Sequence, residues 1–468
     1  MTARPELMLR QGTSWARTVT RNRCASRVAV EETVTEIALR AEGLYKVFGR
    51  QPQEAVARLQ AGASRSELDG ATAAVIDASF EVKRGEIFVV MGLSGSGKST
   101  LIRMLNGLLD ATAGTVEING ERLTGATAPQ VRAVRRRNVS MVFQHFALLP
   151  HRTVLDNVAY GLEVRGVAKN ERLAAARQTV ELVGLSGWED HLPGELSGGM
   201  RQRVGLARAL AADTDVLLMD EAFSALDPLI RREMQEQLVE LQSKLGKTII
   251  FITHDLNEAM FLGDRIAVMR DGRIVQIGSP EDILTDPAND YVEQFVQDVD
   301  RARVLTAASV MEAARASVPA AAGPRAALRT MRDLQTSAVY VVGRDRTLVG
   351  VVRDQDAMRL VRRGTSDLTS IVSDDFSAVA ADTALSELFV PAVESPLPLA
   401  VVDEQQRLLG VVPRVTLLAA LGNVSSSTGE LPTVGPPPTV PITVMTEALD
   451  ATDTATGTGA STASEEAL

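Results

Sequence analysis

The distribution of apolar residues along the chain predicts a buried parallel sheet. Three short runs, 87–90, 216–219 and 248–252, are almost entirely apolar and are bounded by polar residues. Such runs are typical of central parallel strands, which are covered on both faces. After the first run, Leu101, Ile102 and Leu105 recur at helical spacing. The pattern predicts an α/β fold.

Two further stretches alternate between apolar and polar residues, as half-buried strands do. They are 37–49 and 75–82. The residues between them, 50–70, have short helical character and are interpreted as an insertion. Residues 153–195 are polar and are predicted to be mainly helical.

The C-terminal part contains an internal repeat. Residues 341–352 are echoed by residues 401–412. Each copy consists of a strand, a polar turn, a second strand and a helix that begins near Asp354 or Arg414. Two such copies predict a paired small α+β domain, assigned to 331–421, in which each copy buries one face against its twin.

Composition sets the remaining domain boundaries. Residues 1–36 are rich in arginine and are predicted to be a disordered extension, so the first domain is assigned to 37–300. The Ala-rich stretch 301–330 contains two prolines and is predicted to be a linker. Residues 422–468 are acidic, rich in Ser, Thr, Ala and Pro, and poor in large apolar groups, which predicts a disordered tail.

Charge and composition exclude several classes of function. The net charge of −10 argues against nucleic acid as a ligand. The chain has one cysteine, Cys24, so an internal disulfide is excluded. An uninterrupted apolar run of about 18 residues is absent, so a membrane role requires a partner chain. The basic run 132–137 is interpreted as a solvated helix face, with contact to anionic lipid as the alternative.

The strongest chemical motif follows the first apolar run. Residues Gly92 to Ser99 match G-x-x-x-x-G-K-[ST], a loop whose backbone N–H groups surround phosphate oxygens at the start of a helix. Lys98 supplies a cation for the β- and γ-phosphates, and the Ser99 hydroxyl is placed to ligate Mg²⁺. The residues predicted to bind nucleotide here are Gly92, Leu93, Ser94, Gly95, Ser96, Gly97, Lys98, Ser99 and Thr100.

Two more motifs fit a nucleotide-hydrolysing site. Asp220 and Glu221 directly follow the second apolar run, where Asp220 can reach Mg²⁺ and Glu221 can orient or deprotonate the attacking water. Ser197, Gly198 and Gly199 open a helix and offer a second anion site. Asp227, followed by a proline, is predicted to be an N-cap.

The motifs together resemble those of ABC-transporter ATPase subunits. The stretch 196–203, Leu-Ser-Gly-Gly-Met-Arg-Gln-Arg, is similar to the signature of that family, and it lies between the phosphate loop and the Asp220–Glu221 strand, as the family requires. The resemblance implies a P-loop NTPase domain with a RecA-like core and a helical subdomain. It also implies ATP and Mg²⁺ as ligands.

Further roles are implied by the resemblance at matching positions. Gln144 resembles the Q-loop glutamine, which senses Mg²⁺ and the transmembrane partner, and His254 resembles the switch histidine, which contacts the γ-phosphate. The stretch 224–227, which includes Asp227, resembles the D-loop. Phe48 resembles the aromatic residue that stacks on adenine, with Tyr45 as a nearby competitor.

The resemblance also implies an assembly. Two copies pair head to tail, so that the phosphate loop of one faces Ser197–Gly199 of the other. Hydrolysis at this shared interface drives separate transmembrane permease subunits, which receive solute from a substrate-binding protein. The expected location is peripheral, on the cytoplasmic face of the inner membrane.

A narrower resemblance covers roughly residues 37–421. The insertion after Gly49 and the runs 143–151 and 219–231 are similar to those of glycine betaine/proline importer ATPases, and the repeat resembles their paired CBS module. The resemblance implies osmolyte uptake with CBS-mediated regulation. The alternatives are an importer of another small solute, such as a choline derivative or an amino acid, and a soluble ABC ATPase outside transport.

Overall fold

The computed structural model describes residues 36–144, 147–224, 226–297, 299–421 and 437–450. Apart from Glu36, the predicted N-terminal extension lies outside these described residues, so that prediction is untested.

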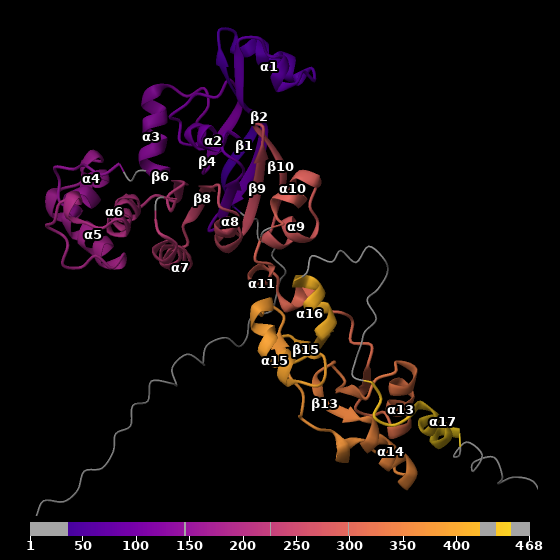
Figure 1. The fold of residues 1–468 in the computed structure, drawn as a ribbon. Coiled ribbons are helices and arrows are strands. Elements are labelled where there is room, and N and C mark those ends of the chain that lie inside the picture. Colours follow the sequence, from indigo (N-terminus) through magenta and orange to yellow (C-terminus); the bar gives the residue numbers. More distant parts are fainter. Residues whose placement is uncertain (1–35, 145–146, 225, 298, 422–436, 451–468) are drawn as a thin grey trace, which may run out of the picture. The chain divides into compact units, whose positions relative to one another are not determined.

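The first part of the chain is built on a six-stranded sheet (Figure 1). Neighbouring strands follow the order β10-β9-β3-β8-β7-β6, and all pairs are parallel except the outer β9–β10 pair. The strands are β3 (Ile87–Met91), β6 (Val139–Val142), β7 (Val216–Asp220), β8 (Thr248–Thr253), β9 (Arg265–Arg270) and β10 (Arg273–Gly278). The three apolar runs of the sequence form β3, β8 and β7, which are adjacent and completely buried, as predicted.

A second, antiparallel sheet packs on one face of the first. Its strands are β1 (Ile37–Gly49), β2 (Ala71–Lys83), β4 (Ala113–Ile118) and β5 (Glu121–Arg122). Phe80 of β2 stacks on Phe88 of β3 with ring centroids 5.1 Å apart, so the two sheets share a core. The insertion between β1 and β2 contains the expected helix, α1 (Pro52–Gln60), whose apolar face is buried.

Helices cover the rest of the parallel sheet. Phe223 and Phe251 pack against each other on the face opposite the antiparallel sheet, together with Met234 and Leu238 of the long helix α7. The helices of this part are α2 (Lys98–Leu105), α3 (Ala128–Asn138), α7 (Pro228–Leu245), α8 (Leu256–Leu262), α9 (Pro280–Thr285) and α10 (Asp290–Phe295).

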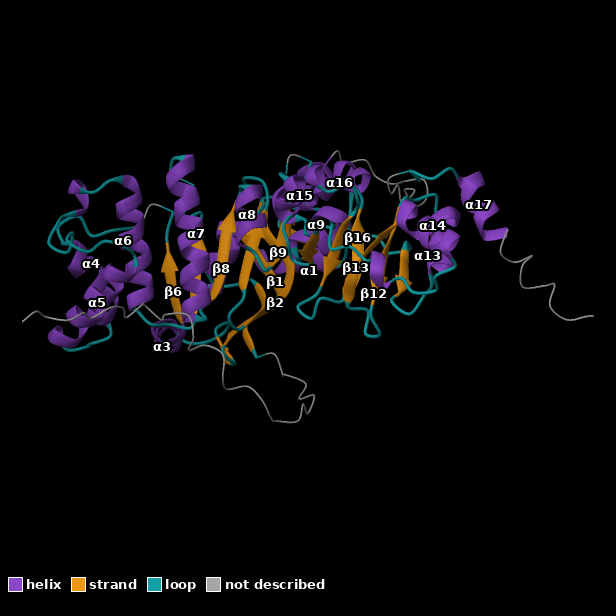
Figure 2. Cartoon of the chain, turned by 90° about the horizontal axis from the view of Figure 1, so that it is seen from below, coloured by secondary structure: helices purple, strands orange, loops and turns teal. Residues whose placement is uncertain are grey.

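Three helices form a subdomain with a core of its own. They are α4 (Val154–Val164), α5 (Lys169–Leu182) and α6 (Gly198–Ala211), and they lie side by side in Figures 1 and 2. Their shared core includes Val158, Val180 and Val204, which are fully buried. The helical stretch predicted for 153–195 is therefore confirmed.

The two copies of the repeat fold alike. The first contains β11 (Ser317–Pro319), α13 (Pro324–Asp333), β12 (Ala338–Val342), β13 (Leu348–Arg353) and α14 (Asp354–Arg363). The second contains β14 (Ala378–Ala380), α15 (Phe389–Glu394), β15 (Leu399–Val402), β16 (Leu408–Val412) and α16 (Arg414–Leu421). In each, a parallel pair of strands is followed by an antiparallel pair. Tyr340 of the first copy packs with Ala400 and Val411 of the second, which confirms the paired arrangement.

The predicted linker, 301–330, contains regular secondary structure. It contains α11 (Arg301–Val304), α12 (Ala307–Val310), β11 and the beginning of α13. Its two prolines mark element boundaries, because Pro319 ends β11 and Pro324 occupies the first turn of α13, where a missing N–H costs nothing. The first repeat therefore begins before residue 331.

The prediction that residues 422–468 form a disordered tail is wrong in one part. Residues 442–450 form α17 (Ile442–Asp450), which packs on α13 and α14 and buries Met445 and Leu449 completely or nearly so. The remainder of the tail, 422–436 and 451–468, lies outside the described residues.

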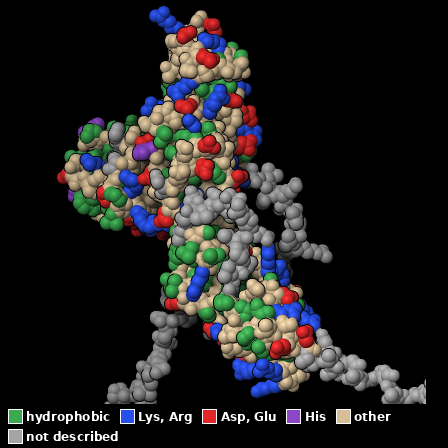
Figure 3. All heavy atoms as spheres, turned by 45° about the vertical axis from the view of Figure 1, so that its right-hand side comes forward, with side chains coloured by type: hydrophobic (Ala, Val, Ile, Leu, Met, Phe, Trp, Pro, Cys, Tyr) green, Lys and Arg blue, Asp and Glu red, His purple; other side chains and the backbone are tan. Residues whose placement is uncertain are grey.

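None of the helices in the described ranges is long and apolar enough to cross a membrane. On the face of the molecule seen in Figure 3, acidic and basic side chains are interspersed.

Candidate functional site

The phosphate-loop residues form a tight turn between β3 and α2 that tolerates only glycine at key positions. Gly92 and Gly97 have φ angles of 153° and 104°. A Cβ on Gly92 would lie 2.2 Å from the Met269 carbonyl oxygen, and one on Gly97 would lie 2.2 Å from that of Ala74. Ser96 Oγ is buried in the loop without a hydrogen-bond partner. The loop is therefore closely packed from outside and offers an unsatisfied hydroxyl within.

Lys98 holds the loop closed. Its Nζ donates hydrogen bonds to the carbonyl oxygens of Gly92 at 2.7 Å and Leu93 at 3.1 Å. Burial lowers the pKa of Lys98, while the nearby carboxylates of Glu221 and Asp220 act in the opposite direction. A phosphate would add negative charge beside this ammonium, so the position suits the cationic role predicted for it.

Asp220 and Ser99 meet at the end of β7. The Ser99 hydroxyl donates a hydrogen bond to Asp220 Oδ1 at 3.3 Å. Burial raises the pKa of Asp220, and the Ser99 hydrogen bond partly opposes that shift. A hydroxyl and a carboxylate side by side are hard oxygen ligands of the kind that Mg²⁺ prefers. Two of the three residues predicted to hold Mg²⁺ are therefore brought together here.

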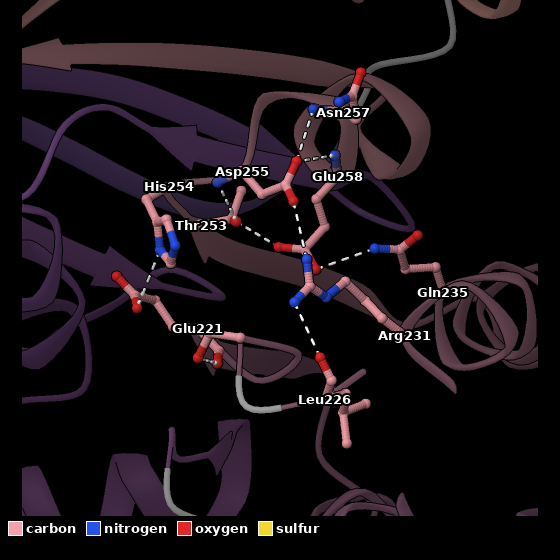
Figure 4. A network of polar contacts seen from close by, with 10 residues as sticks. Glu221, Leu226, Arg231, Gln235, Thr253, His254, Asp255, Asn257 and Glu258 are labelled. Atoms are coloured by element: carbon pink, nitrogen blue, oxygen red, sulfur yellow. Dashed lines mark hydrogen bonds and ion pairs between the residues drawn. The ribbon is translucent and has the colours of Figure 1, made fainter. Parts of the chain in front are cut away.

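Gln144, Glu221 and His254 also converge. Gln144 Nε2 donates to Glu221 Oε2 at 3.2 Å, and His254 Nδ1 lies 3.3 Å from the same carboxylate oxygen (Figure 4 shows the Glu221–His254 pair). The three residues follow β6, β7 and β8, which are parallel neighbours, so their carboxyl ends share one edge of the sheet.

The backbone at Glu221 is held in an unusual conformation. Its φ of 45° lies in the left-handed region, which residues with a side chain seldom adopt. The Glu221 N–H donates to the Ile252 carbonyl oxygen at 2.9 Å, which extends the β7–β8 pairing by one residue. Strained positions of this kind occur preferentially at functional sites.

The two candidate adenine-stacking residues have different environments. Tyr45 is 6% exposed and belongs to the core around α1, so its ring cannot stack on a base. Phe48 at the end of β1 is 44% exposed, and Lys46 Nζ lies 5.2 Å from its ring centroid. Of the two, Phe48 is the one available to a ligand.

The signature residues are not part of the same cluster. Ser197 caps α6 by accepting a hydrogen bond from the Met200 N–H at 3.3 Å, and a Cβ on Gly199 would lie 2.8 Å from Ile230 Cγ2. Within the described residues, no hydrogen bond joins Ser197–Gly199 to the phosphate loop. Asp227 caps α7 through Ile230 N–H at 3.1 Å, as predicted.

Sequence reasoning missed a polar network behind His254. Arg231 of α7 contacts both Leu226 and Asp255, and the buried Glu258 accepts hydrogen bonds from Thr253 and Gln235 (Figure 4). Burial raises the pKa of Glu258. Isolated charges on amphipathic helices carry no motif, so the sequence offered little signal for this network.

Tyr291 of α10 was also missed. Its hydroxyl shares a hydrogen bond with the Leu93 backbone in the phosphate loop, and Arg270 lies 4.3 Å from its ring centroid. The two positions are almost 200 residues apart, which explains why local patterns did not connect them.

The fold and the site together define a P-loop ATPase.

Comparison with known proteins narrows this class. Residues 75–224 match the ABC transporter family, and residues 307–363 match the CBS domain family. The chain is 52% identical over 388 residues to the glycine betaine transport ATP-binding protein OpuAA of Bacillus subtilis, covering 82% of this chain and 92% of that protein.

Two further relatives are similarly close. The glycine betaine/carnitine transport ATP-binding protein GbuA of Listeria monocytogenes is 49% identical over 82% of this chain and 97% of its own length. The glycine betaine/proline betaine transport system ATP-binding protein ProV of Salmonella typhimurium is 45% identical over 399 residues, which cover 84% of this chain and 100% of that protein. The chain therefore belongs to the family of ABC transporter ATP-binding proteins that includes these glycine betaine transport proteins.

Proposed function

We propose that the chain powers the uptake of glycine betaine or a closely related methylated amine. The observation that carries this proposal is the high identity to OpuAA, which extends over both the ATPase domain and the repeat. Other relatives are named for carnitine, proline betaine and trimethylamine N-oxide, so the substrate class is a small, fully substituted amine.

Uptake in membrane vesicles tests the substrate. The chain would be combined with its cognate permease and substrate-binding protein, and ATP-dependent accumulation of radiolabelled glycine betaine would be measured with unlabelled carnitine, choline and proline as competitors. We expect saturable glycine betaine uptake that requires ATP. Transport of an unrelated solute in its place would contradict the proposal.

The site residues divide the work of hydrolysis among them. The amides of the phosphate loop and Lys98 bind the phosphates, and Phe48 stacks on adenine. Ser99, Gln144 and Asp220 would hold Mg²⁺, which neutralises phosphate charge. Glu221 orients or deprotonates the attacking water, and His254 holds Glu221 and contacts the γ-phosphate.

Catalysis requires two copies. Since no hydrogen bond within the described residues joins Ser197–Gly199 to the phosphate loop of their own chain, we propose that they complete the phosphate loop of a second copy, with Asp227 near the shared interface. The helix N-terminus that Ser197 caps would then face the γ-phosphate.

Glu221→Gln tests this division of roles. We expect the variant to bind ATP and accumulate as an ATP-bound dimer, while turnover falls by about 100-fold or more because the base is lost. Glu236→Gln on the exposed face of α7 is the matched control and should leave turnover unchanged. Near-normal hydrolysis by Glu221→Gln would show that the base is another group.

A groove between α3, β6, α4 and α6 is proposed as the docking site for the permease. It is lined by apolar side chains, among them Phe143 and Val164, and by Arg132, Arg135 and Arg136 on one side. We assign the basic run to this groove rather than to anionic lipid, because its arginines stand beside exposed apolar groups. A permease segment with apolar and acidic residues would fit, and it would place the chain on the cytoplasmic face of the membrane.

Charge reversal tests the docking site. Arg132→Glu should reduce uptake at least about tenfold while ATP binding by the isolated chain stays unchanged, since the phosphate loop is not altered. Arg122→Glu, an exposed arginine on β5, is the control. Equal losses of uptake in both variants would argue against a specific groove.

The repeat is proposed to adjust transport to ionic strength through charged surfaces that salt screens. Because the first repeat begins by residue 307, a deletion must start there and not at residue 331, which would cut α13. Vesicle uptake would be measured at several internal salt concentrations with the intact chain and with this deletion. A salt response that survives the deletion unchanged would contradict the proposal.

A further inference from the structure

Arg231 joins two segments that carry the proposed catalytic residues. One guanidinium nitrogen, NH2, donates to the Leu226 carbonyl oxygen at 3.0 Å, and the other, NH1, donates to Asp255 Oδ2 at 3.1 Å (Figure 4). Leu226 lies in the turn that follows Glu221, and Asp255 directly follows His254. The arginine therefore touches both sides of the Glu221–His254 pair from behind.

The His254 side of this bridge is firmly held. Asp255 Oδ1 caps α8 by accepting from the N–H groups of Asn257 at 3.0 Å and Glu258 at 3.2 Å. The Asp255 N–H donates to Thr253 Oγ1 at 2.9 Å. Because the Asp255 carboxylate and backbone are both engaged, a shift of this residue would move His254 with it.

The Glu221 side is a tight turn. Ser224 Oγ and its N–H donate to the Glu221 carbonyl oxygen at 2.9 and 3.2 Å, and the Leu226 N–H donates to the Phe223 carbonyl oxygen at 3.2 Å. Leu226 is thus coupled to Glu221 through hydrogen bonds within the turn. A ring is closed by the two Arg231 hydrogen bonds, the Glu221–His254 contact and the chain itself, which runs from Glu221 to Leu226 and from His254 to Asp255.

We propose that Arg231 is a positioning residue that sets the placement of Glu221 relative to His254. The proposal rests on the proposed roles of those two residues in hydrolysis. An arginine suits the position because its planar fork can serve two acceptors from different segments at once, whereas a lysine offers a single point of charge. The side chain is 26% exposed, so the interaction is partly shielded from water.

Steady-state kinetics of the full chain test the proposal. Arg231→Met keeps the length and apolar stem but removes both hydrogen bonds. We expect its kcat to fall between about 10- and 100-fold, as small misplacements of catalytic groups do, while the Kd for ATP stays unchanged. Arg231→Lys should recover part of the loss. Arg232→Met is the matched control. Arg232 is exposed and pairs with Glu236 on its own helix, so its loss should leave kcat unchanged.

A double-mutant cycle separates positioning from a general structural role. Asp255→Asn keeps the oxygen that caps α8 and weakens the contact with Arg231. If the two residues act as one unit, combining it with Arg231→Met should cost little beyond the larger single effect. The proposal would be overturned if the fold-losses in kcat of the two single variants multiply in the double variant. A kcat for Arg231→Met within twofold of the unmodified chain would overturn it as well.

Two more measurements keep the result unambiguous. Thermal unfolding of every variant shows whether a lower kcat reflects loss of folded protein, and recovery of full activity at a lower temperature would overturn the proposal. Glu221→Gln, assayed in parallel, tests the catalytic assignment itself. If Glu221→Gln is inactive and Arg231→Met is fully active, positioning by Arg231 is refuted and the assignment of the base stands.

Discussion

The contact between the helix α17 and the first repeat combines apolar packing with hydrogen bonds to one buried carboxylate. Asp354, the first residue of α14, is 1% exposed. Its Oδ2 accepts hydrogen bonds from the N–H groups of Thr439 and Val440, just before α17, the latter at 2.8 Å. We predict that Asp354→Ala detaches α17 from the repeat while the rest of the domain stays folded.

The magnitude follows from the two hydrogen bonds. A hydrogen bond to a charged group contributes about 1.5–3 kcal/mol, so the pair contributes about 3–6 kcal/mol. Every 1.4 kcal/mol corresponds to about a factor of ten, and the opening equilibrium of α17 should therefore rise roughly 100-fold or more. Helices shorter than about 12 residues are not stable alone in water, and α17 has 9, so the detached segment should unfold.

Hydrogen–deuterium exchange over residues 442–450 measures this opening directly. We expect Asp354→Ala to lose protection in α17 and to retain it in β12 and β13. Asp356→Ala is the control, because Asp356 also lies in the first turn of α14 but pairs locally with Arg359. Protection of α17 within twofold of the unmodified chain would refute the reasoning, as would an equal loss in the control.

Three other perturbations follow from the site. Gly97→Ala should abolish nucleotide binding in a fluorescent-nucleotide titration, because its Cβ would meet the Ala74 carbonyl oxygen at 2.2 Å; retained affinity would contradict the packing argument. Glu258→Gln removes a carboxyl whose pKa burial raises. Ionising that carboxyl costs folding free energy, so the stability of the variant relative to the unmodified chain should increase as pH rises above about 4.5, the usual pKa of a glutamic acid; denaturant unfolding at several pH values measures the difference, and a pH-independent difference would count against it. Tyr291→Phe should raise the KM for ATP about threefold or more by removing the contact with Leu93, one modest hydrogen bond, without changing the melting temperature; an unchanged KM would show that this contact does not support the loop.

The sequence predicts the nucleotide site well because its parts are local or lie at strand ends. The phosphate loop is one continuous motif whose spacing reflects backbone geometry. Asp220 and Glu221 directly follow an apolar run, and His254 follows another by one residue, so a parallel sheet brings them to one edge. The Arg231 network could not be predicted in this way, because its partners come from α7, α8 and a turn whose packing no periodicity reveals.

The helix α17 was missed for a different reason. Val440, Val444, Met445, Ala448 and Leu449 recur at helical spacing. The surrounding Ser-, Thr- and Pro-rich composition nevertheless favours disorder when the tail is averaged as a whole. A helix this short gains its stability from the surface on which it packs. That surface is the apolar face of α13 and α14, including Leu328, Met331 and Val361, which lies far away in the sequence.

The two repeats show why symmetry alone did not reveal this surface. Asp354 and Arg414 occupy equivalent positions, each the first residue of the helix that follows the antiparallel strand pair. Asp354 accepts hydrogen bonds from the N–H groups that precede α17. Arg414 instead donates to the carbonyl oxygens of Val393 at 2.9 Å and Ser395 at 2.6 Å, within its own repeat. A carboxylate accepts hydrogen bonds from backbone N–H groups, whereas a guanidinium donates them to backbone carbonyl oxygens. Because the two repeats carry opposite charges at this equivalent position, the first repeat can hold the segment before α17 by this contact and the second cannot.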